Sequence, residues 1–85
     1  MLNIAVCDDD TQFAENMKIQ IQNIAKQNFV DAEIDVFWNG ESLVNAVIDG
    51  ASFDMIYLDI EMENEDGISA AKKIRMYDKT VLIIY

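Results

Sequence analysis

The chain has 85 residues, 52% of them hydrophobic, and its 16 acidic and 6 basic residues give a formal net charge of −10. This length allows one small domain, and the apolar content allows a buried core, which excludes a disordered acidic tail. The negative charge repels phosphate backbones and anionic lipid, so we expect no direct binding to nucleic acid or to a membrane.

In chain order, short apolar runs alternate with stretches of helical periodicity. Leu2–Cys7 is an apolar run with β-branched residues and predicts a buried strand. Asp10 or Thr11 can cap a helix that reaches about Asn28. Apolar residues recur on one face of this helix, namely Phe13, Met17, Ile21, Ile24 and Ala25.

A second strand is predicted over Ala32–Trp38, and it is followed by Asn39-Gly40, a pair typical of tight hairpins. We reject the hairpin here, because the apolar residues that follow have helical spacing and Gly50 closes a second helix. These residues are Leu43, Val44, Val47 and Ile48.

The second half of the chain continues the alternation. Phe53–Asp59 predicts a third strand, a third helix runs from about Asp66 to Tyr77, and Thr80–Tyr85 predicts a fourth strand. The resulting β-α-β-α-β-α-β order implies parallel strands joined by right-handed crossovers, with helices on both faces. The predicted fold class is therefore an open, doubly wound α/β sheet.

Two of the predicted strands end on carboxylates. Asp8 and Asp9 follow the first strand, and Asp59 ends the third. Ligands of open α/β sheets bind beyond the carboxyl ends of the strands, so the three side chains converge on one pocket if these strands are neighbours. A single acid after a strand is usually a turn residue or a helix cap, and this is our interpretation of Asp10 and of Asp66-Gly67.

Converging carboxylates require a positive partner. Two carboxylates about 4 Å apart repel by about 4 kcal/mol at an effective dielectric near 20. A site made of oxygen ligands suits Mg²⁺, and a carboxylate beside that ion can attack phosphorus to form an aspartyl phosphate. Asp59 is the expected nucleophile, because it ends a buried strand and is rigidly held.

Other residue types narrow the function further. Cys7 is the single cysteine, so it is interpreted as a small buried hydrophobe and no internal disulfide can form. The absence of histidine excludes Ser-His-Asp and Cys-His catalysis and histidine-bearing zinc sites within this chain. We find no membrane span or export signal, so the expected location is the cytoplasm.

Several further residues are interpreted as structural rather than functional. Phe37-Trp38 is assigned to the core and its rim, and the basic residues Lys72, Lys73 and Arg75 to a solvated helix face. Glu63 and Glu65 are interpreted as solvated loop residues.

Three segments resemble the receiver domains of two-component response regulators: "AVCDDD", "FWNGESL" and "MIYLDIEMENEDG". The resemblance runs the full length of the chain, and the first and last segments are similar in particular to receivers attached to LytTR-type DNA-binding domains. It implies a flavodoxin-like (CheY-like) sheet with strand order 2-1-3-4, and it assigns residues 1–85 to the N-terminal portion of one receiver domain.

The resemblance also implies residue roles. Asp59 would accept a phosphoryl group from a sensor histidine kinase, and the domain would catalyse at most its own phosphorylation and dephosphorylation. Mg²⁺ would be held by Asp8, Asp9, Asp59 and the backbone carbonyl of Glu61. The added charge would then regulate an output domain that controls transcription, or a second receiver.

The chain departs from the family pattern in two places. Glu63 stands where relatives usually carry proline. The chain also stops at Tyr85, before the fifth strand, the last helices, and the Ser/Thr and Lys that hold the phosphoryl group in the family. We therefore expect a fragment of a longer regulator, and an uncovered fourth strand invites pairing or domain swapping between copies.

Other functions remain open at this stage. A degenerate receiver would act by protein–protein contact without phosphorylation. A phosphatase-like hydrolase with an aspartyl nucleophile is disfavoured, since Glu61 and Glu63 replace residues of its Asp-x-Asp-x-Thr motif. A calcium loop is set aside because Gly67 is misplaced for it, and a dinucleotide site is set aside because "AVCDDD" contains no glycine.

Overall fold

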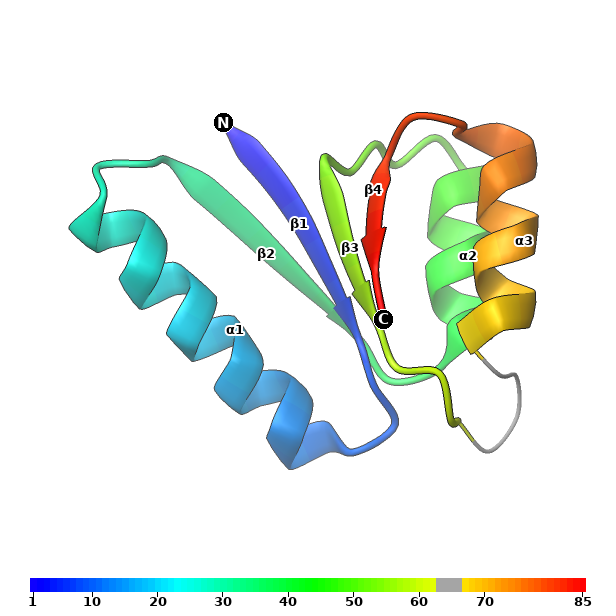
Figure 1. Ribbon diagram of the computed structural model, residues 1–85, viewed down its shortest axis with the longest axis horizontal. Coiled ribbons are helices and arrows are strands. Elements are labelled where there is room, and N and C mark those ends of the chain that lie inside the picture. Colours follow the sequence, from blue (N-terminus) through cyan, green and yellow to red (C-terminus); the bar gives the residue numbers. More distant parts are fainter. Residues whose placement is uncertain (63–66) are drawn as a thin grey trace.

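The computed structural model describes residues 1–62 and 67–85, and in this part of the chain strands and helices alternate as predicted. All neighbouring strands are parallel, in the order β2-β1-β3-β4, which confirms the predicted doubly wound sheet and its strand order (Figure 1). The elements are β1 (Leu2–Cys7), α1 (Thr11–Gln27), β2 (Ala32–Phe37), α2 (Gly40–Ile48), β3 (Met55–Leu58), α3 (Gly67–Tyr77) and β4 (Leu82–Ile84).

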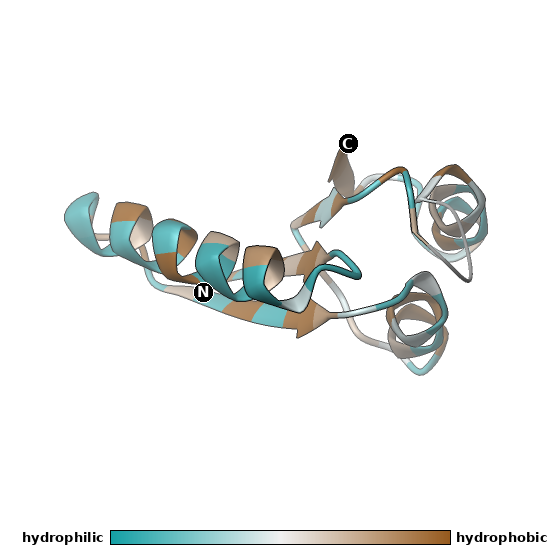
Figure 2. Cartoon of the chain, turned by 90° about the horizontal axis from the view of Figure 1, so that it is seen from below, coloured by the Kyte–Doolittle hydropathy of each residue, from teal (hydrophilic) through white to brown (hydrophobic). Residues whose placement is uncertain are grey.

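Helices cover both faces of the sheet. Helix α1 lies along β1 and β2, whereas α2 and α3 pack side by side on the other face (Figures 1 and 2). Because successive side chains of a strand point to opposite faces, β1 contributes to two cores. Ala5 and Cys7 belong to the larger core under α2 and α3, and Ile4 and Val6 to the smaller core under α1.

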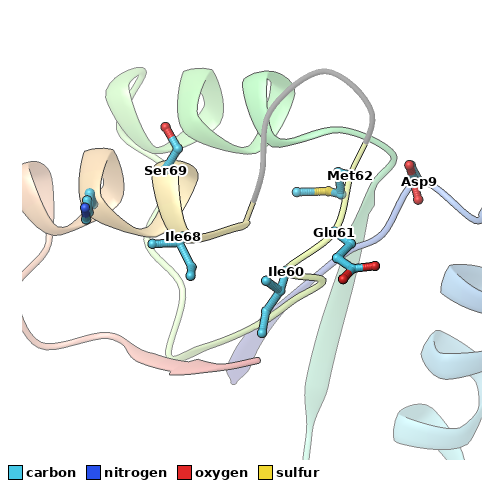
Figure 3. Close-up of a pocket in the computed structure, with 7 residues that line it drawn as sticks. Asp9, Ile60, Glu61, Met62, Ile68 and Ser69 are labelled. Atoms are coloured by element: carbon cyan, nitrogen blue, oxygen red, sulfur yellow. The ribbon is translucent and has the colours of Figure 1, made fainter.

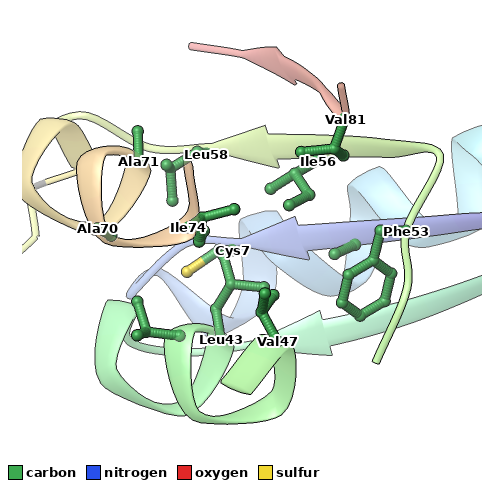
Figure 4. Packing of buried hydrophobic residues seen from close by; sticks show 12 residues of the cluster. Cys7, Leu43, Val47, Phe53, Ile56, Leu58, Ala70, Ala71, Ile74 and Val81 are labelled. Atoms are coloured by element: carbon green, nitrogen blue, oxygen red, sulfur yellow. The ribbon is translucent and has the colours of Figure 1, made fainter. Parts of the chain in front are cut away.

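The larger core is built from small and branched side chains that let the two helices approach the sheet closely (Figure 4). Ala70 and Ile74 of α3, Leu43 of α2 and Leu58 of β3 have no exposed surface. An edge-to-face contact between Phe37 and Phe53, with ring centroids 6.0 Å apart, closes one end of this core. These contacts fix α3 against the sheet, directly beside the end of β3.

Side chains cap the first two helices, and the cap of the first is one of the two that the sequence predicts. The Asp10 carboxylate accepts a hydrogen bond from the Phe13 amide at 3.0 Å and caps α1. The Asn39 side chain accepts one from the Ser42 amide at 2.7 Å, so Asn39 starts α2. The predicted absence of a hairpin at Asn39-Gly40 is confirmed, because the apolar spacing after the pair outweighs its local hairpin preference, and the structure adds that Asn39 is the cap of the helix.

Three strands are shorter than predicted. Strand β2 ends at Phe37 and β3 begins at Met55, whereas the sequence patterns extend to Trp38 and from Phe53. Strand β4 covers only Leu82–Ile84, since the Asp78 carboxylate accepts hydrogen bonds from the amides of Thr80 and Val81 and holds them in a turn. The predicted start of the third helix at Asp66, and the turns assigned to residues 63–66, lie outside the described residues.

The apolar face predicted for α1 is only partly buried. Met17 and Ile21 pack against the smaller core, but Ile24 is 60% exposed. The reason is that this end of α1 borders an open groove, lined across from it by Leu2, Ile4 and Met55, instead of a closed core. No helix within residues 1–62 and 67–85 is long and apolar enough to cross a membrane.

Candidate metal centre

The three predicted carboxylates follow two strands that are direct neighbours. Cys7 at the end of β1 is in register with Leu58 at the end of β3, so Asp8 and Asp59 leave the sheet side by side. Two backbone hydrogen bonds extend the ladder past the strand ends: the Asp59 amide donates to the Cys7 carbonyl, and the Asp8 amide to the Phe37 carbonyl, both at 3.0 Å. The parallel sheet therefore sets the backbone positions of both acids.

The carboxylates of Asp8, Asp9 and Asp59 form one cluster. One oxygen from each lies within 4.8 Å of the others, which is the arrangement expected if the two strands are neighbours. Their environments differ: Asp8 is buried with 6% exposure, Asp59 is half-buried and Asp9 is exposed. The cluster thus opens toward solvent on the Asp9 side.

Local hydrogen bonds orient two of these carboxylates. Asp8 Oδ1 accepts from the Asp10 amide at 3.0 Å, and Asp59 Oδ1 accepts from the Glu61 amide at 3.2 Å. Both bonds join a side chain to the backbone two residues further on, a turn that Asp favours at the end of an element. Each acid keeps a second oxygen that these bonds do not use.

The electrostatics of the cluster centre on Asp8. Burial raises the pKa of the Asp8 carboxyl above its ordinary value, the charges of Asp59 and Asp9 raise it further, and the hydrogen bond from the Asp10 amide opposes this. A buried carboxylate beside two others is costly to ionise. A divalent cation among the three removes that cost, and oxygen ligands from one or two carboxylates suit Mg²⁺. The residues present therefore fit this ion.

Glu61 lies beside the cluster through its backbone. The hydrogen bond from its backbone amide to the Asp59 carboxylate places Glu61 next to the cluster. Glu61 and Asp9 together line an open pocket of about 750 Å³. Figure 3 shows Asp9 and Glu61 on one side of this pocket and Ile68 and Ser69, at the start of α3, on the other. The pocket extends from the acids to α3 over a mostly apolar floor that includes Ile60.

Three residues around the site were not assigned to it from the sequence. Ser69 and Lys72 line the same pocket, although Lys72 was interpreted only as part of a solvated helix face. Gly67 packs against the backbone of Asp59 and Ile60, and its amide donates to the Ile60 carbonyl at 2.8 Å. The "DG" pair indicated only a turn, so the sequence carried no signal for this contact.

Most of the residues interpreted as structural have that role in the fold. Cys7 is fully buried, and its thiol contacts the Asn39 carbonyl and the Met62 sulfur at 3.4 and 3.8 Å. Trp38 is 54% exposed at the rim of the core. Arg75 differs from the prediction of a solvated side chain, because its guanidinium donates to the Val81 carbonyl at 2.6 Å and ties α3 to the start of β4.

Comparison with known proteins gives consistent results. The sequence pattern of the response regulator receiver domain family matches residues 4–85. The two-component response regulator ARR22 of Arabidopsis thaliana is 33% identical over 85 residues, which cover 99% of this chain and 56% of that protein. The chain thus spans about half the length of this curated relative.

Two similar solved structures contain the response regulator TrrA of Thermotoga maritima. One is its complex with Mg²⁺-BeF, with 32% identity and a TM-score of 0.83. The other is the complex of histidine kinase ThkA with TrrA, with 31% identity and a TM-score of 0.80. In both, the match covers 98% of this chain and 66% of the other.

Proposed function

The chain belongs to the family of response regulator receiver domains, and on that premise we propose that it accepts a phosphoryl group on Asp59 with the help of Mg²⁺. The observation that carries the proposal is the convergence of Asp8, Asp9 and Asp59 within 4.8 Å at the ends of two adjacent strands. Residues 1–85 are assigned to one receiver domain under the same proposal.

Each residue of the site has a distinct proposed role. Asp8, Asp9, Asp59 and the backbone carbonyl of Glu61 would hold Mg²⁺. When bound, this ion offsets the carboxylate charge and the charge of an incoming phosphoryl group. The presence of Mg²⁺-BeF in the TrrA complex supports an ion of this type. Burial of Asp8 and exposure of Asp9 suit a site that is anchored inside and open to solvent outside.

The proposed reaction is a phosphoryl transfer to a carboxylate. An oxygen of Asp59 attacks the phosphorus of a phosphohistidine, so a P–O bond forms, the P–N bond breaks, and the released imidazole nitrogen takes up a proton. Because Asp59 Oδ1 accepts a hydrogen bond from the Glu61 amide, we assign the attack on phosphorus to Oδ2. The residue is itself modified, so the domain is a phosphoryl acceptor and not an enzyme acting on a separate substrate.

The proposed phosphodonor partner is a sensor histidine kinase, and the complex of ThkA with TrrA supports a partner of this kind. Phosphorylation adds negative charge at the end of β3 and would be sensed by an output domain, such as a transcriptional one, or by a second receiver.

The proposal includes a cytoplasmic location, where phosphodonors made from ATP are available. It includes no direct contact of this chain with nucleic acid or membrane, since the net charge is −10.

The test is intact-mass spectrometry after incubation with acetyl phosphate, with and without Mg²⁺, beside an Asp59→Asn variant. We expect the wild-type chain to gain one phosphoryl group only with Mg²⁺, and the variant to gain none. Absence of any gain, in this chain and in a longer version of the regulator, would contradict the proposal and favour a degenerate receiver that acts by protein–protein contact.

A further inference from the structure

The first residue of α3 touches the backbone of the proposed phosphoryl acceptor. A Cβ atom built on Gly67 would lie 2.9 Å from the carbonyl carbon of Asp59 and from the Cα of Ile60, and closer still to the Asp59 carbonyl oxygen. Real side chains do not tolerate such distances to backbone atoms, so only glycine fits at this position while the backbone stays in place. Both neighbours belong to the turn that carries the carboxylate.

We propose that Gly67 is a positioning residue for the acceptor site, which rests on the function proposed above. Its missing side chain lets α3 pack against the backbone of Asp59 and Ile60, and the hydrogen bond of 2.8 Å from its amide to the Ile60 carbonyl holds that turn from the helix side. On the β1 side, the Asp59 amide donates to the Cys7 carbonyl. The turn is thus clamped between a strand and a helix.

A shift of the clamped turn would move the reacting groups directly, because they belong to the turn or are hydrogen-bonded to it. Asp59 carries the carboxylate, and the Glu61 amide holds Oδ1 of that carboxylate at 3.2 Å. Helix α3 cannot easily move away from the sheet, because Ala70 and Ile74 are fully buried in the larger core (Figure 4). A methyl group at residue 67 therefore displaces the turn at least as readily as the helix, and misplacement of a reacting group by about 1 Å can slow a reaction roughly 100-fold.

Gly50 supplies a matched control. It has a φ of +106° at the end of α2, so alanine there strains the backbone, yet a Cβ would meet no atom within 4 Å. Gly50→Ala thus lowers stability without pressing on residues 59–61. Both Gly67→Ala and Gly50→Ala should lower the free energy of unfolding, but only Gly67→Ala should disturb the site.

The experiment measures urea unfolding, Mg²⁺ affinity by calorimetry and the phosphorylation rate with acetyl phosphate for the wild type and both variants. For Gly67→Ala we expect Mg²⁺ binding to weaken and phosphorylation to slow by about 10- to 100-fold. For Gly50→Ala both values should stay within about twofold of the wild type at a comparable loss of stability. A folded Gly67→Ala variant with wild-type affinity and rate overturns the proposal.

A second measurement decides the question if Gly67→Ala does not fold. In amide spectra of the wild-type chain, the Gly67 signal should shift on addition of Mg²⁺ while the Gly50 signal does not, and an unmoved Gly67 signal overturns the proposal. If the wild type binds Mg²⁺ but neither this chain nor the longer version is phosphorylated, the proposed function is refuted, and the Mg²⁺ affinities of folded variants, or else the Gly67 signal, still decide the role of Gly67. A wild-type chain that binds no Mg²⁺ refutes both.

Discussion

Replacement of Asp8 by asparagine separates the two roles of the acidic cluster, its cost to the fold and its use as a metal site. Asn is nearly the same size as Asp, and its Oδ1 can still accept the hydrogen bond from the Asp10 amide. Its amide group can also donate to Asp59, which the Asp8 carboxylate cannot do. Asp8→Asn therefore removes one buried negative charge and leaves the local turn intact.

The size of the effect follows from the geometry. At 4.8 Å, the upper limit on the separation of the three facing oxygens, two unit charges repel by about 3.5 kcal/mol at an effective dielectric of about 20. Asp8 has two such neighbours, but Asp9 is exposed and water screens most of its charge. We expect Asp8→Asn to raise the free energy of unfolding by about 1–2 kcal/mol without metal, which is roughly 4–16 °C in Tm for a domain of this size.

Mg²⁺ should remove most or all of the stability advantage of Asp8→Asn. For the wild type, free Mg²⁺ at about 100 times its Kd adds about 2.7 kcal/mol to the free energy of unfolding. Asp8→Asn loses a proposed ligand and should gain less than about 1 kcal/mol at the same concentration. Urea unfolding with and without MgCl₂ measures both values. Asp35→Asn, on the exposed part of β2, is the control for net charge alone and should leave the Mg²⁺ response unchanged.

Two outcomes would refute this reasoning. If Asp8→Asn is no more stable than the wild type without metal, the carboxylates do not repel one another across the cluster. If the variant keeps the full Mg²⁺ response, Asp8 does not take part in binding the ion. An equal gain in Asp35→Asn would show that the effect comes from the total charge and not from the cluster.

Three further predictions concern titration, capping and the thiol. Because the pKa of Asp8 is raised in the fold, the stability that this group contributes falls as the pH rises through that pKa, so the advantage of Asp8→Asn without metal should vanish in acid when unfolding is followed against pH. Asn39→Ala removes the cap of α2 and should cost about 1 kcal/mol in urea unfolding, whereas Asn45→Ala on the exposed side of α2 should cost nothing. The Cys7 thiol is fully buried, so it should react with Ellman's reagent only at the rate of unfolding, and fast labelling of the native chain would contradict its place in the core.

The acidic cluster could be predicted because it depends on two strong regularities. Apolar runs identified the first and third strands, and the carboxyl ends of parallel strands meet at one edge of a sheet. The in-register pair of Cys7 and Leu58 then brings Asp8 and Asp59 together. The helix cap at Asp10 was predictable for a similar reason, since capping depends on residues only three positions apart, whereas the cap at Asn39 was not predicted.

What the sequence did not reveal depends on contacts between distant segments. Periodicity shows that Ile24 lies on the apolar face of α1, but it does not show that this end of the helix borders an open groove. The shortening of β4 follows from the Asp78 side chain, which competes with the strand for backbone amides. The role of Gly67 depends on how closely α3 docks against the end of β3, which no local pattern encodes.

The most direct test of the account is to locate the phosphoryl group on the chain. Reduction of the phosphorylated protein with borohydride converts an aspartyl phosphate into homoserine, and fragmentation mass spectrometry then identifies the modified residue. The account predicts homoserine at residue 59 alone, formed only when Mg²⁺ was present during phosphorylation. Modification at Asp8 or Asp9 instead, or equal labelling of Asp59 without Mg²⁺, would contradict the proposed division of roles among the three acids.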